Sequence, residues 1–261
     1  MNSIPRYSLL GVQVDGLTQR ELNTVVRDAV ESGASRIIAN HNLHSMLLYR
    51  EDPKMREFYA RAAYTVIDGM SMVILGRLLG LPLKRANRLA MLDSLGPILA
   101  EAAARGWRVF HLGNTVKVST EGAAYLGACY PGLEIVAESG YFDATPGSED
   151  NRRIIEKIHS FRPHILLVGM GMPRQEQWIV DHIEQLSGMV VFHVGAYLGY
   201  LAGDIPTPPR WIGQIGLEWL FRLCSEPQRL WHRYLVEPWL LLRLILQQSS
   251  RKLPSTEDTT P

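Results

Sequence analysis

The sequence predicts an α/β protein built around a doubly wound, mostly parallel β-sheet. Short apolar runs rich in β-branched residues alternate with helical patterns over residues 1–204. Several of these runs are continuously apolar, as parallel strands are when helices cover both faces of their sheet. A chain of 261 residues is long enough to bury a full core in such a fold. We therefore expect a Rossmann-like core domain at residues 1–204.

Seven segments have the length and composition of strands. They are Ser8–Val14, Arg36–Ala39, Tyr64–Ile67, Arg108–Leu112, Leu133–Ala137, Ile165–Val168 and Val190–Val194. Ligands of open parallel sheets bind at the carboxyl ends of the strands. The residues that directly follow these segments are therefore the first place to look for a functional site.

Three helix starts are visible between the strands. Thr18-Gln-Arg-Glu21 has the pattern of a capping box, and Asp52-Pro53 is an N-cap followed by a proline in the first turn. Asp93 is expected to open a helix at Leu95–Ala104.

The composition changes after Ile205. Residues 206–252 contain seven basic and three acidic side chains, a local net charge of +4, and four of the six tryptophans. Tryptophans can lie at the level of lipid headgroups, and basic residues are attracted to anionic lipid. We expect a helical, membrane-binding appendage at 205–252 and a disordered tail at 253–261. The alternative is a pair of core helices whose tryptophans pack internally.

Several functional classes are excluded by what the sequence lacks. With 27 basic and 26 acidic residues, it shows no basic excess for nucleic acid. It has no disulfide framework, zinc motif, P-loop, Asp-x-Asp metal motif or GxSxG, and the four histidines near strand ends, His41, His44, His111 and His193, show no metal-ligand spacing. No apolar stretch reaches the roughly 20 residues of a spanning helix. We therefore expect an intracellular protein with no metal or cofactor and no nucleic-acid partner.

Two asparagines follow the second segment. Asn40 and Asn42 alternate along an extended chain, so both carboxamides can face one cleft, where they would suit sugar hydroxyls. Alternatively, they are turn-forming residues.

A carboxylate follows the third segment. Asp68 at a strand end, with Gly69 allowing close approach of the backbone, is well placed to act as a general base. It could equally be the N-cap of a helix at Ser71–Leu79.

The most informative run leads from the sixth segment into a Gly-x-Gly turn. Gly169 and Gly171 precede Pro173, which is expected at the first helical position, with Arg174-Gln-Glu176 in the first turn. Free backbone N–H groups and the helix dipole favour an anion there. Gly113, which follows the fourth segment, fits a tight turn better than a nucleotide site.

A longer set of motifs matches one family in order and spacing. The motifs are Asn42, Asp68-Gly69, Arg88 with Asp93, Leu112-Gly113, Gly140-Tyr-Phe142, Val168 to Glu176, Val194-Gly195, Ala202-Gly203, Pro209-x-Trp211, Gly216 to Arg222, Glu226-Pro227-x-Arg229 and Arg233-Tyr234. Through them the chain resembles the WecG/TagA/CpsF glycosyltransferases, bacterial inverting enzymes that build cell-surface polymers on lipid carriers. The resemblance covers nearly all of residues 8–236.

The resemblance implies transfer of a sugar from a UDP-sugar to an undecaprenyl-diphosphate-linked acceptor, by an enzyme bound peripherally to the inner face of the plasma membrane. It makes Asp68 the catalytic base and places Gln175 at the donor. The other residues expected at the donor are Asn40, Asn42, Arg88, Asp93, Gly113, Gly169, Gly171, Arg174 and Glu176. Arg222, Arg229 and Arg233, with Trp219, would face the acceptor diphosphate and the membrane.

Four sites depart from the family pattern. Asn40 replaces the usual Thr, Met91 a Gly and Thr207-Pro208 an Arg-Ala pair, while His232 lies where some members carry Arg. These changes surround the sugar pocket and the appendage, so the donor stays open among N-acetylmannosamine, its uronic acid, glucose, galactose and glucuronic acid. The acceptor glycan and the oligomeric state, including a homo-oligomer formed through an apolar face, also stay open.

Two rival functions belong to other classes. A non-catalytic nucleotide-binding or scaffold protein is compatible with the altered residues at 40 and 207, but retention of Asp68 and Gln175 counts against it. A dehydrogenase would need the GxGxxG turn and its downstream acid, which the sequence lacks.

Overall fold

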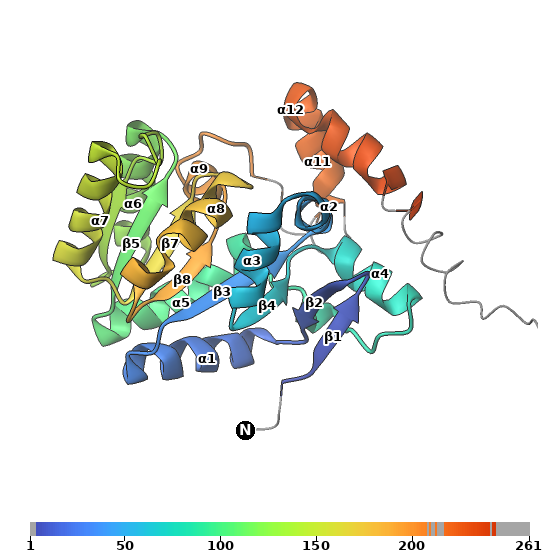
Figure 1. The fold of residues 1–261 in the computed structure, drawn as a ribbon, viewed down its shortest axis with the longest axis horizontal. Coiled ribbons are helices and arrows are strands. Elements are labelled where there is room, and N and C mark those ends of the chain that lie inside the picture. The colour runs from blue at the N-terminus through green and yellow to red at the C-terminus, as the bar shows by residue number, and fades with distance from the viewer. Residues whose placement is uncertain (1–3, 208, 210–211, 213–216, 241, 244–261) are drawn as a thin grey trace, which may run out of the picture.

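The computed structural model describes residues 4–207, 209, 212, 217–240 and 242–243. Within these residues the predicted α/β fold is confirmed as a six-stranded sheet in the order β4-β3-β8-β7-β5-β6, with every neighbouring pair parallel (Figure 1). The strands are β3 (Arg36–His41), β4 (Tyr64–Ile67), β5 (Arg108–Gly113), β6 (Glu134–Glu138), β7 (Ile165–Gly169) and β8 (Val190–His193). All six agree with predicted segments to within two residues at each end.

The prediction of a single first strand is wrong. Ser8–Val14 is split into β1 (Arg6–Leu9) and β2 (Val12–Asp15), which form an antiparallel hairpin outside the main sheet. Leu10 and Gly11 make the turn, with φ angles of 52° and 88°. The apolar Leu10 hides this turn in the sequence, although the following glycine readily takes a positive φ. Asp15 fastens the hairpin by accepting the backbone N–H of Thr65 on β4.

Helices cover both faces of the sheet. They are α1 (Gln19–Ser32), α2 (Leu43–Glu51), α3 (Pro53–Arg61), α4 (Met70–Leu78), α5 (Met91–Arg105), α6 (Val116–Cys129), α7 (Glu149–Phe161), α8 (Arg174–Asp181) and α9 (Tyr197–Leu201), with short 3-10 turns η1 (Arg85–Asn87) and η2 (Ile183–Leu186). The capping box at Thr18 and the N-cap at Asp52 are confirmed. The predicted start at Asp93 is wrong, because α5 begins at Met91 and Asp93 lies inside its first turn.

The core has one cluster on each face of the sheet. Helices α1, α5 and α6 pack on one face against Val109, Leu167 and Phe192, while α3, α7 and α8 pack on the other against Phe110 and Leu166. A third, smaller cluster joins the β1–β2 hairpin to α2 and α4. Burial on both faces explains why the strands read as continuous apolar runs.

The described part of the appendage is helical, as predicted. It contains α11 (Glu218–Ser225), α12 (Pro227–Trp231) and a π-helical turn η3 (His232–Val236), which lie apart from the sheet (Figure 1). The predicted tail at 253–261 falls outside the described residues. No helix in the described ranges is both long and apolar enough to cross a membrane.

Candidate active site

A cavity of about 660 Å³ opens at the carboxyl ends of the central strands. Strand ends supply one side of it, through Asn40 of β3, Asp68 after β4, Gly169 of β7 and His193 of β8. The appendage also contributes lining residues, including Arg222, Leu230 and Arg233. The site thus lies where ligands of open parallel sheets bind.

Asp68 lines this cavity and is not the cap of α4. Gly69, with a φ of +104°, occupies the N-cap position, and no side chain caps that helix. The backbone N–H of Asp68 instead donates to the carbonyl of His41 on β3 at 2.9 Å. A β-bridge between Ile67 and Arg88 brings Arg88 next to the end of β4, which Asp68 directly follows. Arg88 and Asp68 both line the cavity.

Asn40 and Asn42 both line the cavity, as their alternation predicts. Asn42 is also a cap, because its Oδ1 accepts the N–H of Ser45 at 3.0 Å. Asn40 is only 5% exposed, and its Nδ2 donates to the carbonyl of His193 at 2.9 Å. Asn42 therefore both caps α2 and forms part of the cavity wall.

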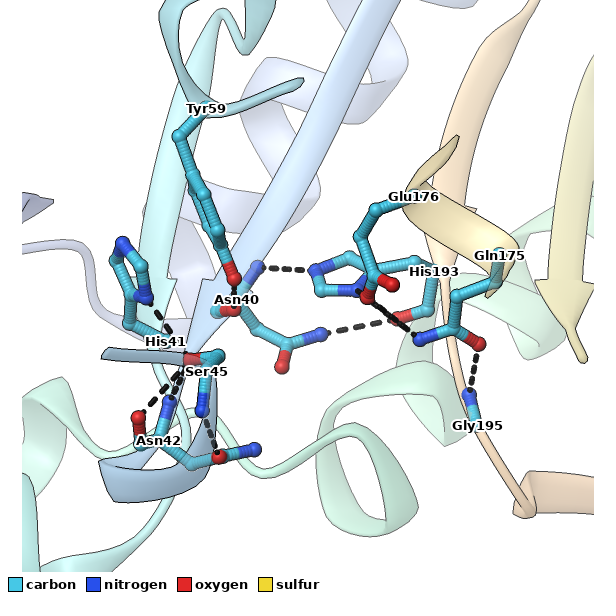
Figure 2. A network of polar contacts seen from close by, with 9 residues as sticks. All are labelled: Asn40, His41, Asn42, Ser45, Tyr59, Gln175, Glu176, His193 and Gly195. Atoms are coloured by element: carbon cyan, nitrogen blue, oxygen red, sulfur yellow. Dashed lines mark hydrogen bonds and ion pairs between the residues drawn. The ribbon is translucent and has the colours of Figure 1, made fainter. Parts of the chain in front are cut away.

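A buried network holds Gln175 against the cavity (Figure 2). The backbone N–H of Asn40 donates to His193 Nε2 at 2.7 Å, so that nitrogen carries no proton. The proton sits on Nδ1, which donates to Glu176 Oε1 at 2.6 Å. Gln175 Nε2 donates to the same carboxylate oxygen at 2.8 Å, and Gln175 Oε1 accepts the N–H of Gly195 at 3.1 Å. The carboxamide of Gln175 is consequently fixed in one orientation.

The glycines at the strand ends allow three strands to meet closely. A Cβ on Gly113 would lie 2.3 Å from the carbonyl oxygen of Gly169, and one on Gly169 would lie 2.5 Å from that of Gly195. Gly169 and Gly171 line the cavity, whereas Gly113 and the fully buried Glu176 lie behind its wall. Gly113 and Glu176 therefore support the wall of the cavity and do not line it.

The helix that follows the Gly-x-Gly turn differs in two details from its prediction. Pro173 is the N-cap, and α8 begins at Arg174. The N–H of Gln175 is not free for an anion, because it donates to the carbonyl of Gly171 at 3.0 Å. Arg174 does reach the cavity, where its Nη2 also donates to the carbonyl of Phe142 at 2.7 Å.

Four arginines line the cavity from different elements. Arg88 forms an ion pair with Asp93 at 3.0 Å, and both residues face the cavity with Arg174. In the appendage, Arg222 lies 5.0 Å from the centre of the Tyr200 ring, and Arg233 completes the set. The side chain of the predicted Arg229 falls outside the described residues, and Trp219 is 40% exposed and lies away from the cavity lining.

Comparison with known sequences places these motifs in one family. The sequence model of the glycosyl transferase WecG/TagA/CpsF family matches residues 7–254. The chain belongs to this family. A protein of Staphylococcus aureus strain MRSA252 is 26% identical over 235 residues, which cover 86% of this chain and 87% of the relative. One of strain MW2 is 28% identical over 236 residues, with the same two coverages. Both are named N-acetylglucosaminyldiphosphoundecaprenol N-acetyl-beta-D-mannosaminyltransferase.

Two aromatic residues of this glycosyltransferase, Tyr59 and His41, hold the backbone of Asn40 in place. The hydroxyl of Tyr59 donates to the carbonyl of Asn40 at 2.8 Å, and the ring of His41 stacks on Tyr59 with a centroid distance of 3.7 Å. Burial raises the pKa of Tyr59 well above its ordinary value, and the negative charges of Glu176 and Asp68 raise it further. Burial, with the nearby His193, holds the pKa of His41 well below its ordinary value. Both groups therefore stay neutral at physiological pH.

Sequence reasoning missed several residues that line the cavity of the transferase. His44 of α2 pairs with the buried Glu237 of the appendage at 2.9 Å, which ties the appendage to the core at the cavity edge. Tyr141 is 74% exposed at the rim, and Gly140-Tyr141 was available only as a family motif. In the sequence, His193 is visible only as a histidine near a strand end without metal-ligand spacing. Its role depends on the adjacency of β3 and β8, for which the sequence carries no local signal.

The described residues contain no group of three or more His, Cys, Asp or Glu side chains placed to hold a metal ion. Within this part of the chain, the polar side chains that line the cavity are carboxamides, histidines, arginines, tyrosines, one threonine and the carboxylates of Asp68, Asp93, Asp204 and Glu237.

Proposed function

We propose that this protein is an inverting glycosyltransferase that moves a sugar from a UDP-sugar to an undecaprenyl-diphosphate-linked acceptor at the inner face of the plasma membrane. The observation that carries the proposal is that Asp68 lines the same cavity as four arginines. Of the other carboxylates that line the cavity, Asp93 is paired with Arg88 and Glu237 with His44. Asp68, at the end of a strand, provides a base for an acceptor, and the arginines provide counter-charges for a diphosphate.

Asp68 is the general base of the proposed reaction. Its carboxylate removes the proton from an acceptor hydroxyl as that oxygen attacks the anomeric carbon of the donor. The new glycosidic bond forms on the face opposite the leaving group, the bond to the diphosphate oxygen breaks, and UDP departs with the electron pair. General-base assistance of this kind contributes on the order of 10²–10⁴-fold to the rate.

The arginines stabilise the negative charge that develops on the leaving diphosphate. Arg88 and Arg174 come from the core, and Arg222 and Arg233 come from the appendage. Preorganised donors in a cleft with limited water are worth more than the same groups in bulk solvent. The carboxamides of Asn40, Asn42 and the fixed Gln175 are the groups that recognise the hydroxyls of the transferred sugar.

The names of the relatives favour one donor. Both Staphylococcus aureus proteins are named as N-acetylmannosaminyltransferases acting on N-acetylglucosaminyldiphosphoundecaprenol. UDP-N-acetylmannosamine is therefore the first donor to examine, with that lipid as acceptor. A thermal-shift screen of UDP-sugars should show the largest stabilisation with this donor. A larger shift with UDP-glucose or a UDP-uronic acid would reassign the donor and leave the reaction class intact.

The appendage is proposed to hold the enzyme at the membrane. Trp219, Trp231 and Trp239 are 40%, 51% and 70% exposed, so they are not packed inside a helix pair. Trp211 lies outside the described residues. Exposed indole rings among basic residues are suited to the headgroup region of an anionic bilayer.

The decisive experiment replaces the proposed base. Asp68→Asn should lower turnover by about 10²–10⁴-fold, because it removes the proton acceptor, and should change UDP affinity little. Release of UDP is measured with the lipid acceptor present, and UDP affinity by calorimetry. Near-normal turnover in the variant would reject Asp68 as the base. Absence of acceptor-dependent UDP release in the native protein would favour the non-catalytic scaffold. The anomeric configuration of the product, read by NMR, tests inversion.

A further inference from the structure

Helix α4 has apolar residues on both its inner and its outer face, where Ser71 and Arg77 are its only exposed polar residues. Its inner face, with Met72 and Val73, is buried in the small cluster shared with the hairpin and α2. Its outer face carries Ile74 and Leu78, which are 51% and 79% exposed, and the C-cap residue Leu79 is 43% exposed. An exposed apolar patch of this kind marks a contact surface.

The segment around α4 is basic and contains no acid. Residues 69–92 include Arg77, Lys84, Arg85 and Arg88 but neither Asp nor Glu, so the segment has a net charge of +4. The rest of the chain has 23 basic and 26 acidic residues, a net charge of −3. Arg77 of α4, Lys84 and Arg85 are exposed, and η1, which begins at Arg85, contacts α4. Exposed apolar side chains flanked by basic ones are complementary to an anionic bilayer, where both kinds of residue find partners.

The location of α4 agrees with such a contact. The helix begins two residues after Asp68, which lines the cavity. Figure 1 shows α4 and the appendage helices α11 and α12 at the same end of the molecule, remote from α7. Asp68, just before α4, and residues of the appendage such as Arg222 and Arg233 line the same cavity.

We propose that the outer face of α4, together with Arg77, Lys84 and Arg85, is a second membrane-docking surface that binds an anionic lipid bilayer. The core domain then contacts the membrane itself and does not depend on the appendage alone. A lipid-linked acceptor would enter the cavity between the two contacts. This reading rests on the lipid-linked acceptor of the proposed function, but bilayer binding can be measured without any turnover.

The test uses the full-length protein and sedimentation with vesicles of phosphatidylglycerol and phosphatidylethanolamine, compared with phosphatidylcholine alone. Ile74→Gln/Leu78→Gln should weaken partitioning into the anionic vesicles by about tenfold or more, because two largely exposed apolar side chains lose their burial in lipid. The matched control is Val116→Gln on α6, where an apolar residue is 71% exposed on another part of the surface. It should change partitioning less than twofold.

A second pair of variants examines the charges. Arg77→Gln/Lys84→Gln should weaken binding to the anionic vesicles by about tenfold, and salt should weaken the native protein in the same way. Lys117→Gln, which removes a 79% exposed lysine from α6, is the matched control and should have little effect.

Two other occupants of the α4 face give distinct results. If the face binds a second copy of this chain, Ile74→Gln/Leu78→Gln abolishes a concentration-dependent dimer in analytical ultracentrifugation and leaves vesicle binding unchanged. If another part of the chain covers the face, the same variant lowers the melting temperature and leaves vesicle binding unchanged. Either result overturns the proposal.

Turnover on a short, water-soluble acceptor separates this inference from the proposed function. It should be the same in the α4 variants and the native protein. Absence of turnover in every form, including the native one, would reject the proposed enzyme, while the vesicle measurements would still decide the role of α4.

Discussion

Glu176 is predicted to support the site through its two hydrogen bonds and not through its charge alone. It is fully buried, and its Oε1 accepts from His193 Nδ1 and from Gln175 Nε2. Glu176→Ala leaves both donors without an acceptor in residues that are at most 2% exposed. Each unsatisfied buried donor costs about 1–3 kcal/mol, so the free energy of unfolding should fall by roughly 2–6 kcal/mol.

A change of tautomer cannot relieve this loss. If the proton of His193 moved to Nε2, it would meet the backbone N–H of Asn40, whose nitrogen lies 2.7 Å away. Glu176→Gln should be much milder, at about 1–2 kcal/mol, because the amide oxygen can accept both bonds. The new NH₂ group would lie where Glu176 Oε2 has no hydrogen-bond partner, which accounts for a remaining cost.

The assay is urea denaturation of both variants, with Glu184→Ala at an exposed position of η2 as control. UDP affinity is measured alongside, and it should fall several-fold in Glu176→Ala because Gln175 loses its fixed orientation. Equal destabilisation by the alanine and glutamine variants would refute the reasoning, as would a cost under about 1 kcal/mol for alanine.

Three further predictions concern other parts of the molecule. Burial lowers the pKa of His111 to about 3. Below about pH 6.5 the unfolded chain therefore binds a proton that the folded chain does not, so the free energy of unfolding falls as the pH is lowered. His111→Leu should flatten this slope between pH 4 and 6 by about 1.4 kcal/mol per pH unit in urea titrations; an unchanged slope contradicts it. Gly113→Ala should lower the melting temperature through contact with Gly169, whereas Gly127→Ala, which meets nothing within 4 Å, should not. Glu237→Gln should speed proteolysis of the appendage by weakening its bond to His44, and an unchanged rate would argue against the contact.

The sheet could be predicted because each strand carries its own local signal. Burial on both faces makes a strand apolar throughout, and the helix between two strands brings its own caps. The turn of the hairpin at Arg6–Asp15 could not be predicted in this way, because Leu10 continues the apolar pattern through it. At Asp93 the first turn of α5 extends further toward the N-terminus than the acidic residue suggests.

The site was predictable only in part, and for a physical reason. Asp68 directly follows β4, and Gln175 lies in the first turn of the helix after β7, so their positions in the chain bring them to the carboxyl edge of the sheet. The bonds of His193 to Asn40 depend on the sheet order, in which β8 is inserted beside β3 although many residues separate them in the chain. The pairing of His44 with Glu237 likewise depends on how the appendage folds back over the cavity.

The divided origin of the cavity has a consequence for how the donor is protected. Asp68 belongs to the core, whereas Arg222 and Arg233 arrive with the appendage. Under the proposed reaction, a molecule whose appendage is displaced keeps its proton acceptor and loses half of its phosphate counter-charges. Such a molecule would hydrolyse the UDP-sugar slowly when it is away from the bilayer. The ratio of UDP released with and without acceptor lipid would measure this protection of the donor.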